Sequence, residues 1–170
     1  MKITDRWLNS HNWMLRSDND GKSYDDFSWN KINVWTDCPD FDDNSVCGNG
    51  LHGINKQYNN FGIDLGQSRI VLCEIDKICV IDNEKIKTNK AKIVAINSEI
   101  PEKAFEQCNI RIMHDGDNLN IDSGVYLLFS GEVTITQSGG ACRAYDNATI
   151  NNTQSGGYCR AYNNATINKK

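Results

Sequence analysis

Two adjacent segments near the end of the chain decide the fold. TQSGGACRAYDNATINN at 136–152 is followed directly by TQSGGYCRAYNNATINK at 153–169. A direct repeat this short cannot bury its apolar residues alone, so it gains a core by stacking on its neighbours. The repeat therefore predicts an array of stacked units in the last third of the chain.

A finer period of seven to nine residues underlies the repeat and is marked by turn-forming pairs. Such pairs adopt the positive-φ conformations that tight turns need. Alternate residues between them are small or apolar, as at Val133 and Ile135, which is the pattern of strands. We expect strand–turn–strand units that form either a short β-solenoid or a β-meander. The pairs are Asp115-Gly116, Ser123-Gly124, Ser130-Gly131, Ser138-Gly139, Asp146-Asn147, Ser155-Gly156 and Asn163-Asn164.

The middle of the chain also favours strands. Three short apolar runs occur at Ile70–Ile75, Ile78–Ile81 and Ile93–Ile96, all rich in β-branched residues. Pro101 opens a segment that is a short helix at most, because proline suits the first helical position. We expect a mostly β protein (α+β with little helix). An antiparallel sheet core at 1–107 would carry the repeat array, 108–170, packed on it.

Composition places the chain among globular proteins. Hydrophobic residues make up 39% and charged residues 24% of its 170 residues. The first twenty residues have no apolar core typical of a secretory signal, and no apolar run approaches the ~18 residues that cross a bilayer. Seven cysteines, an odd number, favour thiols or metal ligands over disulfides. We therefore expect a cytoplasmic protein without a membrane segment.

Negative charge is concentrated in one segment. Between residues 17 and 46 there are eight aspartates against Lys22 and Lys31, which gives −6 where the whole chain carries −4. Direct nucleic-acid binding is not expected, because it needs clustered Lys and Arg. An acidic segment instead suits a basic partner surface, although aspartates also favour solvated turns. The candidate partner-binding residues are Asp18, Asp20, Asp25, Asp26, Asp42 and Asp43.

A second candidate site is a cysteine- and glycine-rich loop, DCPDFDDNSVCGNGLHG at 37–53. Cys38, Cys47 and His52 are typical zinc ligands, and the neighbouring glycines would let the backbone wrap an ion. Structural zinc takes four ligands, and Cys73 in the next predicted strand is the candidate for the fourth. The alternatives for the fourth ligand are Cys79, His11 and Asp37. The alternative for the whole loop is buried cysteines without a metal.

Catalytic interpretations of this loop are weaker. Its glycines spell G-x-G-x-x-G, but that fingerprint is meaningful between a strand and a helix, and 54–64 has no helical periodicity. Cys47 and His52 have the composition of a nucleophile and a base. Residues five apart in a glycine-rich loop more naturally share an ion than a proton. We therefore expect a protein that is not an enzyme.

At these residues the chain resembles a family of small phage and bacterial proteins. Their motif is Cys-Pro-Asp-aromatic-Asp followed by Cys-Gly-x-Gly-Leu-His-Gly, here at 38–42 and 47–53, with Phe41 where tryptophan is more usual. Some members end in Ala-Tyr-x-x-Ala-Thr repeats, as at 144–149 and 161–166. The chain is also similar in style to zinc-containing anti-CRISPR proteins. That similarity implies a host partner, the RNA-guided CRISPR nuclease, in the host cytoplasm.

Three functional hypotheses follow. The first is a zinc-stabilised inhibitor of a host defence nuclease, whose acidic face docks on a basic channel and keeps nucleic acid out. The second is a structural or attachment protein built on the β-repeat array. The third is an ADP-ribosyltransferase-like enzyme in which His52 holds a nucleotide and Glu74 acts on the ribose.

Overall fold

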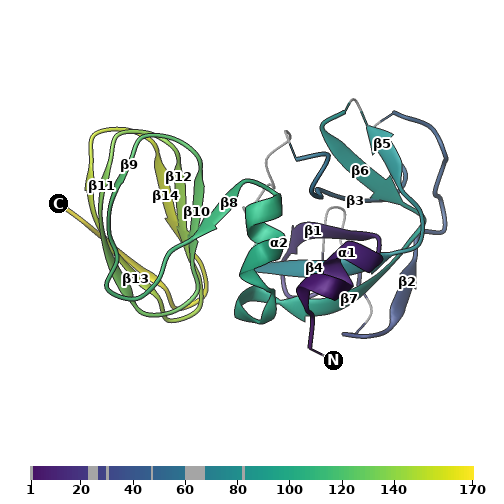
Figure 1. The fold of residues 1–170 in the computed structure, drawn as a ribbon, viewed down its shortest axis with the longest axis horizontal. Coiled ribbons are helices and arrows are strands. Elements are labelled where there is room, and N and C mark those ends of the chain that lie inside the picture. The colour runs from purple at the N-terminus through teal and green to yellow at the C-terminus, as the bar shows by residue number, and fades with distance from the viewer. Residues whose placement is uncertain (1, 23–26, 30, 47, 60–67, 82) are drawn as a thin grey trace. The chain divides into compact units, whose positions relative to one another are not determined.

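The structure is a computed structural model that describes every residue except 1, 23–26, 30, 47, 60–67 and 82 (Figure 1). The chain divides into two compact units, Met1–Cys108 and Asn109–Lys170. Both are built mainly of strands. The described part of the chain has two short α-helices, α1 (Asp5–Ser10) and α2 (Glu102–Gln107). The predicted fold class, mostly β with little helix, is confirmed.

Antiparallel strands form the first unit. One sheet has the order β1-β4-β7-β2, and a smaller one has the order β3-β6-β5. The predicted apolar runs at 70–75 and 93–96 lie in β4 and β7, and the run at 78–81 begins one residue before β5. The first sheet consists of β1 (Trp13–Asp18), β4 (Arg69–Ile75), β7 (Lys90–Ile96) and β2 (Trp35–Asp37), the second of β3 (Leu51–Gly53), β6 (Lys85–Thr88) and β5 (Cys79–Ile81).

A core cluster joins the two sheets of this unit. Met14, Val71 and Cys73 come from the larger sheet, and Leu51 and Ile86 come from the smaller one. Period-two alternation along each strand points one set of side chains into this cluster. The helices are both short: the Thr4 hydroxyl caps α1 by accepting from the Trp7 N–H, and α2 begins one residue after Pro101. The sequence did not predict α1.

The second unit, described in full, is a β-solenoid. Successive strands alternate between two sheets, and every pair is parallel. The chain therefore coils four times, as Figure 1 shows, and the meander alternative is wrong because a meander is antiparallel. One sheet contains β8 (Ile110–Ile112), β10 (Val125–Leu128), β12 (Ala141–Ala144) and β14 (Tyr158–Ala161), the other β9 (Asn118–Ile121), β11 (Glu132–Gln137), β13 (Thr149–Gln154) and β15 (Thr166–Lys169).

The corners of the coils explain the Ser-Gly-Gly signature of the repeat. At each of the seven predicted turns a residue has positive φ, and at the Ser-Gly-Gly corners this is the second glycine, Gly140 or Gly157. The first glycine stacks against the coil before it: a Cβ on Gly139 would meet the Asp122 carbonyl oxygen at 2.0 Å. Side chains are excluded there by the backbone of the neighbouring coil.

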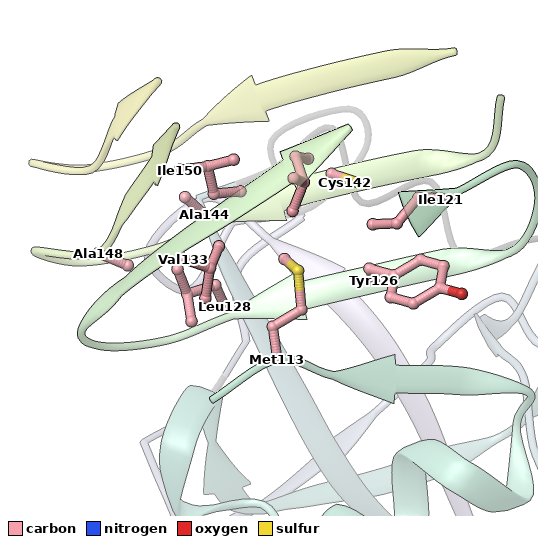
Figure 2. Close-up of a cluster of buried hydrophobic side chains, with 10 residues drawn as sticks. Met113, Ile121, Tyr126, Leu128, Val133, Cys142, Ala144, Ala148 and Ile150 are labelled. Carbon is pink, nitrogen blue, oxygen red and sulfur yellow. The ribbon is translucent and has the colours of Figure 1, made fainter. Parts of the chain in front are cut away.

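Apolar side chains from both sheets fill the interior of the solenoid (Figure 2). They form columns in which each residue stacks on its equivalent in the next coil, such as Val133 on Ile150. One polar side chain inside the solenoid forms hydrogen bonds with backbone groups near a corner of the coil. The Gln137 amide is buried and donates to the carbonyl oxygens of Gly139, Gly140 and Tyr158 at 3.1–3.2 Å. The buried glutamine thus provides further hydrogen bonds to backbone carbonyls at and beside the corner.

Candidate functional site

The cysteine loop begins just after β2. Cys38 is half-buried, and its thiol donates to the Asp40 carboxylate at 3.0 Å. Burial raises the pKa of Cys38 to about 11, and the hydrogen bond to Asp40 acts in the same direction. Cys47, the second predicted ligand, lies outside the described residues.

His52, the third predicted ligand, lies in β3 beside Lys87 of β6. Burial, together with the positive charges of Lys85, Arg16 and Lys87, lowers its pKa to about 4. Its Nε2 is buried without a hydrogen-bond partner among the described residues. The imidazole is therefore neutral at pH 7 and has a lone pair to offer, but three neighbouring cations oppose a metal ion there.

Cys73, the predicted fourth ligand, lies in the middle of β4. It is fully buried in the core, and burial raises its pKa to about 12. The alternative, Cys79, instead contacts the loop, because its thiol donates to the Asn44 carbonyl oxygen at 3.0 Å. Within the part of the chain that the structure describes, no three His, Cys, Asp or Glu side chains gather closely enough to hold a metal. With Cys47 outside that part, zinc stays a prediction.

A lysine side chain organises the aspartate-rich part of the loop. The Lys87 side chain is fully buried, and its ammonium binds the Asp42 carboxylate. It also donates to Asn44 Oδ1 and to the Val46 carbonyl oxygen, both at 3.1 Å. The buried cation thus draws three oxygens of one loop around it. Ion pairing with Lys87 lowers the pKa of Asp42.

Close packing explains one glycine of the loop motif. Gly53 lies where β3 meets β1, and Leu15 and Ile54 exchange two backbone hydrogen bonds of 2.8 and 2.9 Å there. A Cβ on Gly53 would meet the Leu15 carbonyl oxygen at 2.7 Å and the Met14 sulfur at 2.8 Å. This glycine permits strand contact, a role that the sequence analysis assigned instead to wrapping an ion.

The predicted acidic face contains several internal ion pairs. Asp18 is fully buried, and the Arg69 guanidinium binds both of its carboxylate oxygens. Asp42 and Asp43 pair with Lys87 and Lys77. Asp20, whose side chain is 99% exposed, lies 3.7 Å from Arg69 Nη1. Asp25 and Asp26 lie outside the described residues. The sequence analysis missed the three cations because they are 34 to 51 residues away from their partners.

The residues of the enzyme hypothesis lie in different sheets. His52 belongs to β3 of the smaller sheet, and Glu74 belongs to β4 of the larger one. The Glu74 carboxylate lies 2.7 Å from the Lys92 ammonium of the neighbouring strand. Since neighbouring residues of a strand point to opposite faces, Glu74 points away from the core that contains Cys73.

The solenoid presents an ordered outer surface over β9, β11, β13 and β15. Burial alternates along β11, so that Thr134 and Thr136 are exposed between buried residues. Their equivalents in the other coils continue two rows in register. We call these rows the polar face: Asn118, Thr134, Asn151 and Asn168 in one, and Asn120, Thr136 and Thr153 in the other.

Side-chain hydrogen bonds fix part of the polar face. Asn168 Nδ2 donates to Asn151 Oδ1 at 2.9 Å, and Asn151 Nδ2 donates to the Glu132 carboxylate at 2.5 Å. Every residue of the two rows is a threonine or an asparagine, and Lys170, one 17-residue repeat after Thr153, follows the second row at its end. Glu132 lies at the margin of the polar face.

Arginine and tyrosine ladders accompany the other sheet. Arg143 and Arg160 are in register, and their guanidinium carbons lie 5.2 and 4.7 Å from the Tyr158 ring centre. Tyr145 stacks on Tyr162 with ring centres 5.1 Å apart. Tyr145 is fully buried, and Arg143 is buried as well. The tyrosine ladder therefore contributes to packing.

None of the helices in the described part of the chain is long and apolar enough to span a membrane. Comparisons with protein-family models, with curated proteins and with solved structures found no match to this chain.

Proposed function

We propose that the chain is a non-enzymatic attachment protein whose β-solenoid binds a neutral, hydroxyl-rich polymer such as an insoluble polysaccharide. The observation that carries this proposal is the polar face, with threonine and asparagine side chains in register over neighbouring coils. Each of these side chains both donates and accepts hydrogen bonds, as sugar hydroxyls do.

The spacing of the polar face supports a repetitive ligand. Strands of a sheet lie roughly 4.8 Å apart, and alternate residues along a strand are roughly 6.8 Å apart. The face therefore offers hydrogen-bonding groups on a two-dimensional grid. Many weak contacts made at once give useful avidity without a deep pocket. Because the threonine and asparagine side chains of the grid carry no charge, it suits a neutral polymer better than a nucleic acid.

Co-sedimentation of the full chain with insoluble cellulose, chitin or bacterial cell-wall sacculi tests this proposal. The double variant Thr136→Lys/Thr153→Lys places two cations on the polar face and should abolish binding. The matched control Asn147→Lys/Asn164→Lys adds the same charge at exposed corner positions and should still bind. If the wild type stays in the supernatant with all three polymers, or if both double variants lose binding equally, the proposal fails.

The inhibitor hypothesis remains a prediction from the sequence. It requires a basic partner, the RNA-guided CRISPR nuclease of a host, and a zinc ion that stabilises the cysteine loop. Asp20 and Asp43 offer the most exposed carboxylates among the described members of the acidic set. Inhibition that survives charge reversal at Asp20, Asp25, Asp26 and Asp43 would exclude the acidic-face mechanism. Asp18 and Asp42 are left unchanged because their ion pairs stabilise the fold.

A further inference from the structure

Two thiols face each other inside the solenoid. Cys142 of β12 and Cys159 of β14 are directly in register on neighbouring parallel strands. Both belong to the interior cluster, where Cys142 is fully buried and Cys159 is half-buried. The two side chains are hydrogen-bonded to each other, and both cysteines are free. The solenoid repeat thus places a pair of sulfur atoms at one level of its core.

Strand spacing decides what such a pair can do. In-register residues on parallel strands keep their β-carbons about one strand spacing apart, roughly 4.8 Å. A disulfide needs β-carbons about 3.5–4.5 Å apart, so the ladder resists one. A metal–thiolate bond is about 2.3 Å long, and two such bonds in line span about 4.6 Å. The spacing therefore fits one ion between the sulfurs better than a direct bond between them.

The surroundings favour a thiolate at one member of the pair, Cys159. The hydrogen bond with Cys142 lowers the pKa of Cys159, burial opposes this, and the Asn152 side chain and the positive charge of Lys169 lower it further. The same hydrogen bond and burial raise the pKa of Cys142, so the ion itself must displace the proton of that thiol. Asn152 and Lys169 are in register on β13 and β15. Asn152 is fully buried, and its Oδ1 has no hydrogen-bond partner in this unit. The hydrogen bond from Asn152 and the nearby ammonium of Lys169 therefore favour negative charge on Cys159, whereas the unpaired Asn152 Oδ1 favours a cation at this level of the core.

We propose that Cys142 and Cys159 together bind one soft monovalent cation of the Cu(I) class as a two-coordinate bis-thiolate. Soft thiolates select soft ions such as Cu(I). Binding forms two metal–sulfur bonds and releases one proton from each thiol, with no change of oxidation state. The product carries one negative charge, which the Lys169 ammonium balances. A divalent ion would leave the Lys169 charge unbalanced beside the core, and it would require further ligands.

The full chain, reduced and kept free of oxygen, is titrated with Cu(I) against a Cu(I)-specific chelator such as bathocuproine disulfonate. The wild type should withdraw one equivalent of Cu(I) that the Cys159→Ala variant does not withdraw. The control Cys79→Ala removes a half-buried cysteine of the first unit and should retain that equivalent. Uptake by Cys159→Ala equal to that of the wild type would overturn the proposal.

Alkylation locates the ion without any variant. N-ethylmaleimide is added to the wild type with and without one equivalent of Cu(I), and modified peptides are identified by mass spectrometry. We expect Cu(I) to slow the modification of Cys159 and Cys142 and to leave that of Cys79 unchanged. Equal rates at Cys159 in both samples would assign the copper to other cysteines and overturn the proposal. Neither result bears on polymer binding, because the polar face points away from the interior.

Discussion

The two units of the chain are stabilised by different kinds of polar contact. In Met1–Cys108, buried charges pair once each across long stretches of sequence, as Lys87 does with Asp42. In Asn109–Lys170, uncharged side chains pair with their equivalents one coil away, as Asn168 does with Asn151. A unique ion pair has no replacement, whereas a ladder contact is repeated along the stack. A single substitution of an ion-pair residue should therefore lower the stability of the first unit strongly. In the second unit, the loss of stability should depend on where in the stack the substituted residue lies.

The largest expected effect tests the role of position in the stack. Ile150 and Ile167 are equivalent residues in register, but Ile150 is fully buried and Ile167 is half-buried. Ile150→Ala should lower the free energy of unfolding by about 3 kcal/mol and Ile167→Ala by about 1 kcal/mol, because the cost follows buried volume. Urea unfolding monitored by circular dichroism measures both. Equal losses would show that position in the stack does not matter.

The next effect tests the buried charge of the first unit. Lys87→Met keeps most of the side-chain volume but removes the ammonium that binds Asp42, Asn44 and Val46. We expect a loss of about 2 kcal/mol in the free energy of unfolding, since hydrogen bonds to a charged group are lost. The control Lys77→Met removes an exposed lysine that pairs with Asp43 in the same loop, and should cost less than about 1 kcal/mol.

Tryptophan fluorescence measures this pair of variants selectively. All four tryptophans of the chain, at positions 7, 13, 29 and 35, belong to the first unit. If Lys77→Met were as costly as Lys87→Met, the burial of the Lys87 charge would not be what stabilises the loop.

The smallest effect is a pH dependence that belongs to the first unit. The pKa of His52 is lowered to about 4 in the folded protein, whereas an unfolded histidine has a pKa of about 6.5. Between these values the unfolded chain binds a proton that the folded protein does not, so stability falls as the pH decreases from 6.5 to 4. After allowance for solvent screening, the loss should be about 1 kcal/mol.

His52→Gln should remove that part of the pH dependence, while His114→Gln, an exposed position in the solenoid, should leave it unchanged. Chemical denaturation at a series of pH values between 4 and 7 provides the comparison. A pH dependence of the His52→Gln variant identical to that of the wild type would contradict the neutral, buried state of the imidazole.

Prediction from sequence succeeded where the contacts are local in the chain. The seven turn pairs all contain or adjoin a positive-φ residue, and the alternating apolar residues between them line the core. Prediction was incomplete for the candidate site. Cys38 and His52 were recognised by residue type, but the roles of Lys87 and Arg69 were not, because nothing near them in the sequence marks their partners.

The sequence by itself determined the repeat, the strands and their turns, because turn-forming pairs and period-two alternation act locally along the chain. Only the tertiary structure decided between a solenoid and a meander, since both satisfy the same alternation. Only folding, too, brings the Lys87 ammonium to Asp42 across 45 residues and the thiols of Cys142 and Cys159 to one level of the core. The physical reason is that pairing direction and long-range charge contacts depend on where whole strands lie, whereas propensity and periodicity act along the chain.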